Sequence, residues 1–149
     1  LDCLIRQLTY FVNYGELLNQ LSSAYEMLAL YKLREFYEQV NREDMSLRYL
    51  FRLERLHARC QTVLEQGYTL ELIAKHYTWE ETPIDTSNLS SHYADLGLES
   101  SRGLRERLLL DSVQCLQGAQ DWQHAIDVYE PLVELYRMVE PDYDKLHAV

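Results

Sequence analysis

Four arginines in the stretch REFYEQVNREDMSLRYLFRLERLHARC, residues 34–60, are the first side chains whose type and spacing suggest chemistry. Guanidinium groups bind phosphates and carboxylates, so an anion, a lipid or an acidic partner is the functional alternative for this row. Charged rows are also what a packed helix shows to water, and we favour that interpretation, with Asp44 and Glu54 offsetting the charge. The row, called the arginine ridge below, has the spacing i, i+4, i+7 and i+11 and consists of Arg48, Arg52, Arg55 and Arg59.

Residues for catalysis or metal binding do not form a recognisable pattern. The chain has no G-x-S-x-G, no G-x-x-x-x-G-K-[ST] and no H-E-x-x-H motif. His57 and Cys60 share one helical turn, but a zinc site needs four ligands and no second pair accompanies them. We therefore expect no catalytic residue, no cofactor and no metal, and an enzyme with an unfamiliar site is the least favoured class.

Composition and charge narrow the classes of protein further. The 149 residues are 47% apolar and 26% charged, with a net charge of −10. A nucleic-acid-binding domain needs a basic surface, so we expect no nucleic-acid partner. Three cysteines with no close pair fit a reducing compartment, and no apolar run approaches the roughly 18 residues of a membrane helix. These features predict a cytoplasmic protein that does not insert into a membrane.

Helical spacing of apolar residues runs through almost the whole chain, which predicts an all-α fold. We expect a first helix over residues 2–13, ended or interrupted by Gly15, and a second helix over residues 16–39. Asn41 is a good N-cap for a third helix that runs to Cys60, with Glu43 and Asp44 in its first turn. The expected core positions of the second helix are Leu17, Leu18, Leu21, Tyr25, Leu28 and Phe36.

The second half of the chain predicts a helix, a loop and a helical hairpin. Thr62 and Glu65 form a capping box that opens a helix to about His76. Residues 80–102 are the loosest part, with room for one short helical turn. Residues 104–117 and 121–139 then form two helices joined at Gly118. Asp121 is the expected N-cap of the last helix, and Pro131 predicts a kink or break near Tyr129.

The helix that carries the arginine ridge has apolar residues on two faces. Met45, Tyr49, Leu53, Leu56 and Cys60 form one stripe, whereas Leu47 and Phe51 lie opposite. A surface helix has a single apolar stripe, so this helix is expected to lie between two neighbours. We therefore predict a single helical domain over residues 1–149, an antiparallel array of about five to six helices in stacked, solenoid-like hairpins.

The residues between the arginines resemble a known family. Residues 35–60 are similar to the start of the Dock homology region 2 of Dock-family guanine nucleotide exchange factors, whose pattern is FY, E-(E/D)-M, IRYL, a KL step and LH. The matches here are Phe36-Tyr37, Glu43-Asp44-Met45, Leu47-Arg48-Tyr49-Leu50, Arg52-Leu53 and Leu56-His57. Later matches are Glu65, Tyr68, Thr69 and Leu70, then Trp79, and then residues 120–136 and 142–146.

The resemblance covers about residues 34 to 146 and implies a role. The chain resembles the first helical lobe of that region, lobe A, and its motifs are most similar to those of the Rac-directed subfamilies. In that family the later lobes bind the Rho-family GTPase, whereas lobe A packs against the following lobe of the same chain and contributes to homodimerisation. The resemblance therefore implies a non-catalytic lobe. Gln66 and Gly67 depart from the family's small-small pair, as does Pro131, and residues 1–30 and 80–102 match nothing in the pattern.

Two interaction hypotheses follow. If the chain dimerises, its interface should use apolar residues left over from the core of the last two helices. The candidates are Leu109, Val113, Leu116, Val128, Leu135 and Val139. The alternative is a free-standing peptide-binding module of tetratricopeptide type, since residues 116–142 have that repeat's Gly, Ala, Tyr and terminal Pro. Such arrays need roughly three repeats, and only one convincing copy is present.

Overall fold

A computed structural model of the chain describes the backbone of residues 2–139 and the side chains of residues 19–87 and 89–138. Its elements confirm the all-α prediction, because the described backbone consists of helices joined by turns and loops, with a single isolated β-bridge between Pro83 and Ser100. The helices are α1 (Asp2–Gln39), α2 (Glu43–Cys60), α3 (Val63–Ala74), the 3-10 turn η1 (Thr86–Asn88), α4 (Ser91–Asp95), α5 (Ser101–Gly118) and α6 (Trp122–Val139).

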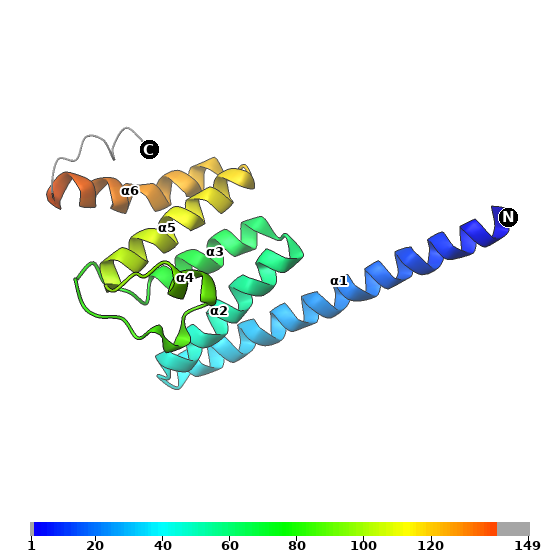
Figure 1. Cartoon of the computed structure of the whole chain (residues 1–149), viewed down its shortest axis with the longest axis horizontal. Coiled ribbons are helices and arrows are strands. Elements are labelled where there is room, and N and C mark those ends of the chain that lie inside the picture. The colour runs from blue at the N-terminus through cyan, green and yellow to red at the C-terminus, as the bar shows by residue number, and fades with distance from the viewer. Residues whose placement is uncertain (1, 140–149) are drawn as a thin grey trace.

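The long helices are stacked in chain order. α1 packs on α2, α2 on α3, α3 on α5 and α5 on α6, and the contact of α3 with α5 is the most extensive. Figure 1 shows this layered array, with α1 at one end, α6 at the other, and the N-terminal half of α1 projecting away from the remaining helices. Among the described helices, those at the two ends of the array, α1 and α6, therefore each pack on one long helix.

α1 differs from the prediction in two ways. It continues through Gly15 as one helix of 38 residues instead of two. The stripe chosen as core also faces solvent, because among residues 19–39 of α1 it is Leu30 that is buried against α2, together with the half-buried Met27. The members of the chosen stripe with described side chains, Leu21, Tyr25, Leu28 and Phe36, are exposed by 48%, 72%, 56% and 54%. Leu17 and Leu18 lie outside the described side chains.

The turn between α1 and α2 corrects the predicted cap. Arg42, not Asn41, is the N-cap of α2, and no side chain caps this end. Asn41 instead adopts the left-handed conformation at φ 54°, which asparagine tolerates better than most residues. Glu43 and Asp44 do occupy the first turn of α2 as predicted.

α2 has the two packed faces that its sequence predicts. Leu53 and Leu56 are buried in a small cluster with Leu30 of α1. On the other side, Leu50 and Phe51 belong to the main core, which α3, α5 and α6 complete. This helix therefore joins the projecting α1 to the rest of the array.

The start of α3 also differs in detail from the prediction. Thr62 is the N-cap, as expected, but its side chain makes no capping hydrogen bond. Its hydroxyl oxygen lies 2.8 Å from Nδ1 of His57 instead. The hydroxyl therefore ties the end of α2 to the start of α3, and α3 ends at Ala74, two residues before the predicted limit.

The segment between α3 and α5 is more ordered than its composition predicts. It contains η1 and α4, and Tyr93 of α4 is only 3% exposed. The Tyr93 hydroxyl donates to Asp111 of α5 at 3.0 Å, and its ring lies 6.1 Å from that of Phe51. At the end of the segment, the Ser101 hydroxyl accepts from the backbone of Thr78 at 2.8 Å. The segment is thus fixed to α2 and α5.

The α5–α6 hairpin follows the prediction except at its proline. Asp121 accepts a long hydrogen bond of 3.4 Å from the His124 amide, which is the expected capping position. α6 continues through Pro131 without a break. The carbonyl that loses its donor belongs to Asp127, and because Asp127 and Pro131 are both exposed, water can take the place of the missing amide.

Candidate functional site

Most of the residues predicted to form an interface are already buried within one copy of the chain. Leu109, Val113, Leu116 and Val128 are exposed by 7% or less and belong to the main core. Leu135 is half-buried, and the side chain of Val139 lies outside the described residues. The four core residues leave little surface for a partner, so among the described candidates only Leu135 has side-chain surface open to one. The interface itself stays a prediction.

Leu109 and Val128 also line a small hollow between α3, α5 and α6. Its volume is about 140 Å³, and Glu71, Arg105, His124 and Pro131 are among the other residues of its wall. His124 Nε2 lies 2.7 Å from Glu71 Oε2, and Lys75 Nζ lies 2.8 Å from Glu71 Oε1. Burial alone would raise the pKa of the Glu71 carboxyl, but the hydrogen bonds from Lys75 and His124 outweigh it and lower the pKa.

The polar contacts between α3 and α6, called the polar seam below, include a second hydrogen bond. The Tyr68 hydroxyl donates to Asp121 at 2.8 Å, which raises the pKa of the Tyr68 hydroxyl. The Tyr68 ring also lies 4.7 Å from the His124 ring. These polar groups satisfy one another, so the seam fastens α6 to α3 rather than presenting free groups to a substrate. Within the described residues, no group of three His, Cys, Asp or Glu side chains has a metal-binding arrangement.

Apolar surface is left open at both ends of the array. On α6, Trp122 and Ile126 are exposed by 59% and 55% and are continued along the helix by the half-buried Tyr129 and Val133. We call these four residues the α6 outer band. On α1, four of the exposed apolar residues share one face and form the α1 outer stripe, which consists of Leu21, Tyr25, Leu28 and Phe36. Contiguous exposed apolar residues of this kind are typical of sites of contact with other proteins, membranes or ligands.

The arginine ridge is exposed, as predicted, but its arginines form no ion pair with Asp44 or Glu54. All four arginines are exposed, and none pairs with a carboxylate whose side chain the structure describes. Asp44 pairs with Arg42 at 3.1 Å instead. Glu54 is buried, and its Oε1 accepts from Gln66 at 2.9 Å. Burial raises the pKa of Glu54 despite this hydrogen bond.

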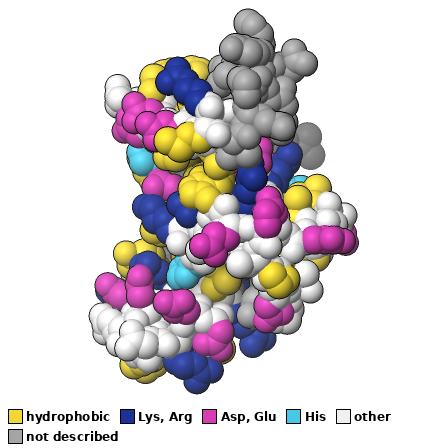
Figure 2. Space-filling model, turned by 90° about the vertical axis from the view of Figure 1, so that its left-hand side faces the viewer, with side chains coloured by type: hydrophobic (Ala, Val, Ile, Leu, Met, Phe, Trp, Pro, Cys, Tyr) yellow, Lys and Arg dark blue, Asp and Glu magenta, His cyan; other side chains and the backbone are white. Residues whose placement is uncertain are grey.

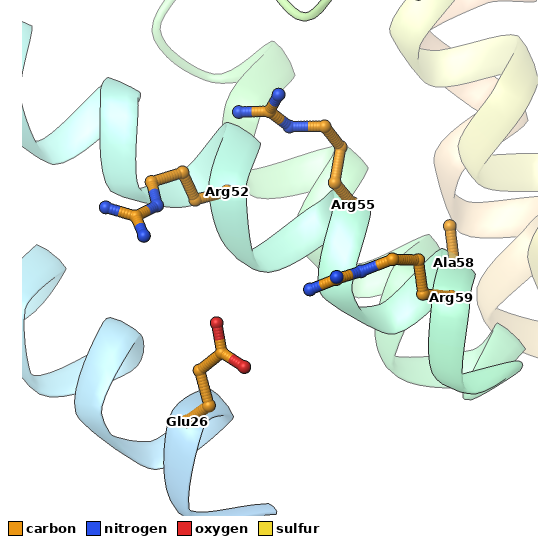
Figure 3. A pocket seen from close by; sticks show the side chains of 5 residues that line it. All are labelled: Glu26, Arg52, Arg55, Ala58 and Arg59. Atoms are coloured by element: carbon orange, nitrogen blue, oxygen red, sulfur yellow. The ribbon is translucent and has the colours of Figure 1, made fainter. Parts of the chain in front are cut away.

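A hollow of about 560 Å³ lies beside the ridge, between α1 and α2. It is lined by Glu26, Arg52, Arg55, Ala58 and Arg59. In Figure 3 the three arginines stand along α2, and the Glu26 carboxylate points from α1 into the same gap. Sequence reasoning found the arginines by their spacing but missed Glu26, because the face of α1 that meets α2 was assigned wrongly.

The charge distribution elsewhere is mixed. On the end of the molecule shown in Figure 2, acidic and basic side chains lie side by side, and among the coloured residues neither sign forms a broad patch.

Of the helices that the structure describes, none has the length and hydropathy needed to cross a membrane.

The described residues define a class: a layered helical array with exposed apolar residues on the helices at its two ends. Over 105 residues the chain is 26% identical to dedicator of cytokinesis protein 4 from Homo sapiens, and the same holds for the protein of that name from Mus musculus. The match covers 70% of this chain and 5% of those proteins, so the chain spans a small part of its relatives' length. No family model matches the chain. The similarity supports the Dock-family resemblance.

Proposed function

We propose that this chain is a non-catalytic helical lobe of a Dock-type guanine nucleotide exchange factor that acts on a Rac-type GTPase in the cytoplasm. The observation that carries the proposal is the similarity to dedicator of cytokinesis protein 4 over 70% of the chain. The order of the helices supports it, since an array that leaves open apolar bands on its end layers is suited to bracing a neighbouring lobe.

The α6 outer band is the proposed docking surface for the following lobe. Each long helix of the array packs on the next one along the chain, and a further helix on α6 would continue that order. Trp122 and Ile126 are the most exposed members of the band. Covering them would bury apolar surface at about 25 cal/mol per Å², which would hold the exchange lobes in a fixed position.

Homodimerisation is the second part of the proposed role. At the other end of the array, the α1 outer stripe is open along a helix that projects from the molecule. Two copies of such a stripe can meet about a two-fold axis, where the same surface serves both partners. We therefore place the main dimer interface on α1 and not on α5 and α6, where the sequence predicted it. The half-buried Leu135 is kept as a second contact.

The tetratricopeptide alternative receives less support. In such arrays one helical pair follows the next closely, so that neighbouring repeats stack. Here α3 does stack on α5, but residues 75–100 separate the α2–α3 pair from the α5–α6 pair in sequence, and this linker packs on α2 and α5 through Tyr93.

A nucleotide-release assay tests the proposed role. The chain alone should leave the release of fluorescent GDP from Rac at its intrinsic rate, whereas the full-length parent should accelerate it. In the parent, Ile126→Asp should lower the exchange rate several-fold by weakening the contact with the following lobe. Arg137→Gln, another exposed position of α6, is the matched control and should have no effect. Acceleration by the chain alone, or a parent inactive on Rac, would contradict the proposal.

A further inference from the structure

The arginine ridge is a row of four positive side chains on a chain of net charge −10, and none of the four forms an ion pair with a described carboxylate. Among the described residues, its one hydrogen bond to the protein runs from Arg55 Nε to the Phe51 carbonyl at 3.3 Å, and all four arginine side chains are exposed to solvent. Like charges spaced i, i+4 on a helix repel one another. An anion lying along the ridge would relieve this repulsion.

The ridge lies between two hollows, which makes the surface concave. On the side of α1 the hollow of about 560 Å³ is lined by Arg52, Arg55 and Arg59 opposite Glu26 (Figure 3). On the other side Arg48, Arg52 and Arg55 line a second hollow of about 550 Å³ with Ser87 and Leu89. Arg52 and Arg55 therefore border both hollows. A ligand lying along the ridge would therefore contact these two side chains whichever hollow it enters.

The dimensions and chemistry fit a short segment of polypeptide. At a rise of 1.5 Å per residue, the ridge from Arg48 to Arg59 is roughly 16 Å long. That is the length of about five residues of extended chain. Guanidinium groups hold carboxylates through paired, charge-assisted hydrogen bonds. Ala58, whose side chain is short, also lines the first hollow.

We propose that the arginine ridge binds an acidic peptide segment of a partner protein. A flat anionic membrane fits less well, because it cannot enter the hollows and would bring a strongly acidic chain against its own charge. A bound peptide contacts the arginine ridge alone. Acidic side chains of this chain that lie more than about 8–10 Å from the peptide are screened at physiological salt. The proposal is independent of the lobe's bracing role, since the ridge lies on neither the α6 outer band nor the α1 outer stripe.

A titration with a fluorescein-labelled, glutamate-rich peptide of about twelve residues, followed by anisotropy, tests the site. The double variant Arg52→Gln/Arg55→Gln should weaken binding about tenfold or more. The control Arg42→Gln/Arg137→Gln removes the same charge at exposed positions away from the ridge and should change the affinity less than about twofold. Circular dichroism should show unchanged helix content in both. A glutamine-rich peptide should not bind.

Glu26→Gln locates the peptide within the site. Removing this carboxylate from the wall of the first hollow should tighten binding about two- to threefold, because a like charge facing the peptide is lost. Equal weakening by the two double variants, no binding by the native chain, or an unchanged affinity of Glu26→Gln would overturn the proposal. Tighter binding to vesicles of phosphatidylserine and phosphatidylcholine than to the peptide would overturn it in favour of a membrane.

Discussion

Gly67 of α3 lies so close to Leu116 of α5 that a Cβ atom on Gly67 would be 3.2 Å from Cγ of Leu116 and 3.2 Å from Cβ of Cys115. The Ser112 hydroxyl donates to the Gly67 carbonyl at 2.8 Å across the same contact. A glycine inside a helix costs roughly 0.5–1 kcal/mol relative to alanine. Here it permits the close approach of the two helices with the most extensive contact in the array.

Enlarging Gly67 should therefore separate α3 from α5. Gly67→Val should lower the free energy of unfolding by about 1–3 kcal/mol, because its methyl groups would overlap Cys115 and Leu116. Urea unfolding followed by circular dichroism measures the change. The matched control is Gly118→Ala, whose new methyl would meet nothing closer than Val63 at 3.8 Å. It should raise stability by about 0.5–1 kcal/mol, and a stabilised Gly67→Val variant would refute the tight contact.

The two faces of α2 predict two different effects of truncation. Phe51→Ala should destabilise the main core by about 3–5 kcal/mol, and Leu53→Ala should loosen α1 by about 2–5 kcal/mol. Because Leu53 contacts the cluster around Leu30, its truncation should speed hydrogen exchange in α1 and leave the amides of α5 protected. The exposed Arg48→Ala serves as control. Equal loss of protection in α1 and α5 for both variants would show that the two faces are not independent.

Because Glu54 is buried, replacing it should stabilise the fold, and the gain should depend on pH. Burial holds the pKa of its carboxyl above the ordinary value of 4.5, so the fold favours the protonated form. The stability from that preference is present at low pH and is lost as pH rises through the raised pKa. Glu54→Gln should therefore be more stable than the native chain near neutral pH, and the difference should close as the pH falls toward 4.5. Thermal unfolding across this range measures it; a difference that widens on acidification would contradict the assignment.

The sequence predicted those features that depend on periodicity within one helix. The two packed faces of α2 and the exposed arginine ridge follow directly from the spacing of apolar and charged residues, and both are confirmed. The end of α2 at Cys60 and the hairpin of α5 and α6 were found by the same reasoning.

Features that depend on which neighbour a helix meets were predicted less well. α1 carries two apolar stripes, and periodicity alone does not show which one α2 covers, so the stripe of Leu21 and Leu28 was wrongly placed in the core. Tyr93 was missed because its segment reads as a polar loop, and its burial depends on Phe51 and Asp111, which lie far away in sequence. The missing charge partners of the ridge were likewise not visible, because Asp44 and Glu54 find other partners within the fold.

The dimer proposal predicts that single charges on exposed apolar positions separate the copies without unfolding them. Leu28→Asp places a carboxylate in the α1 outer stripe, where the native side chain is 56% exposed, and should weaken association at least tenfold, about 1.4 kcal/mol or more. Leu135→Asp should have a smaller effect. Both should keep native helix content by circular dichroism, whereas Leu116→Asp, at a fully buried position, should unfold the chain. Loss of helix content in Leu28→Asp would assign that residue to the core instead.

The solution mass of the native chain tests the central claim most directly. Light scattering on a sizing column, from micromolar to tens of micromolar, should show a mass that rises with concentration from one copy toward two. In the Leu28→Asp variant the mass should stay at that of one copy. A single-copy mass of the native chain over the whole range would contradict dimerisation through this lobe.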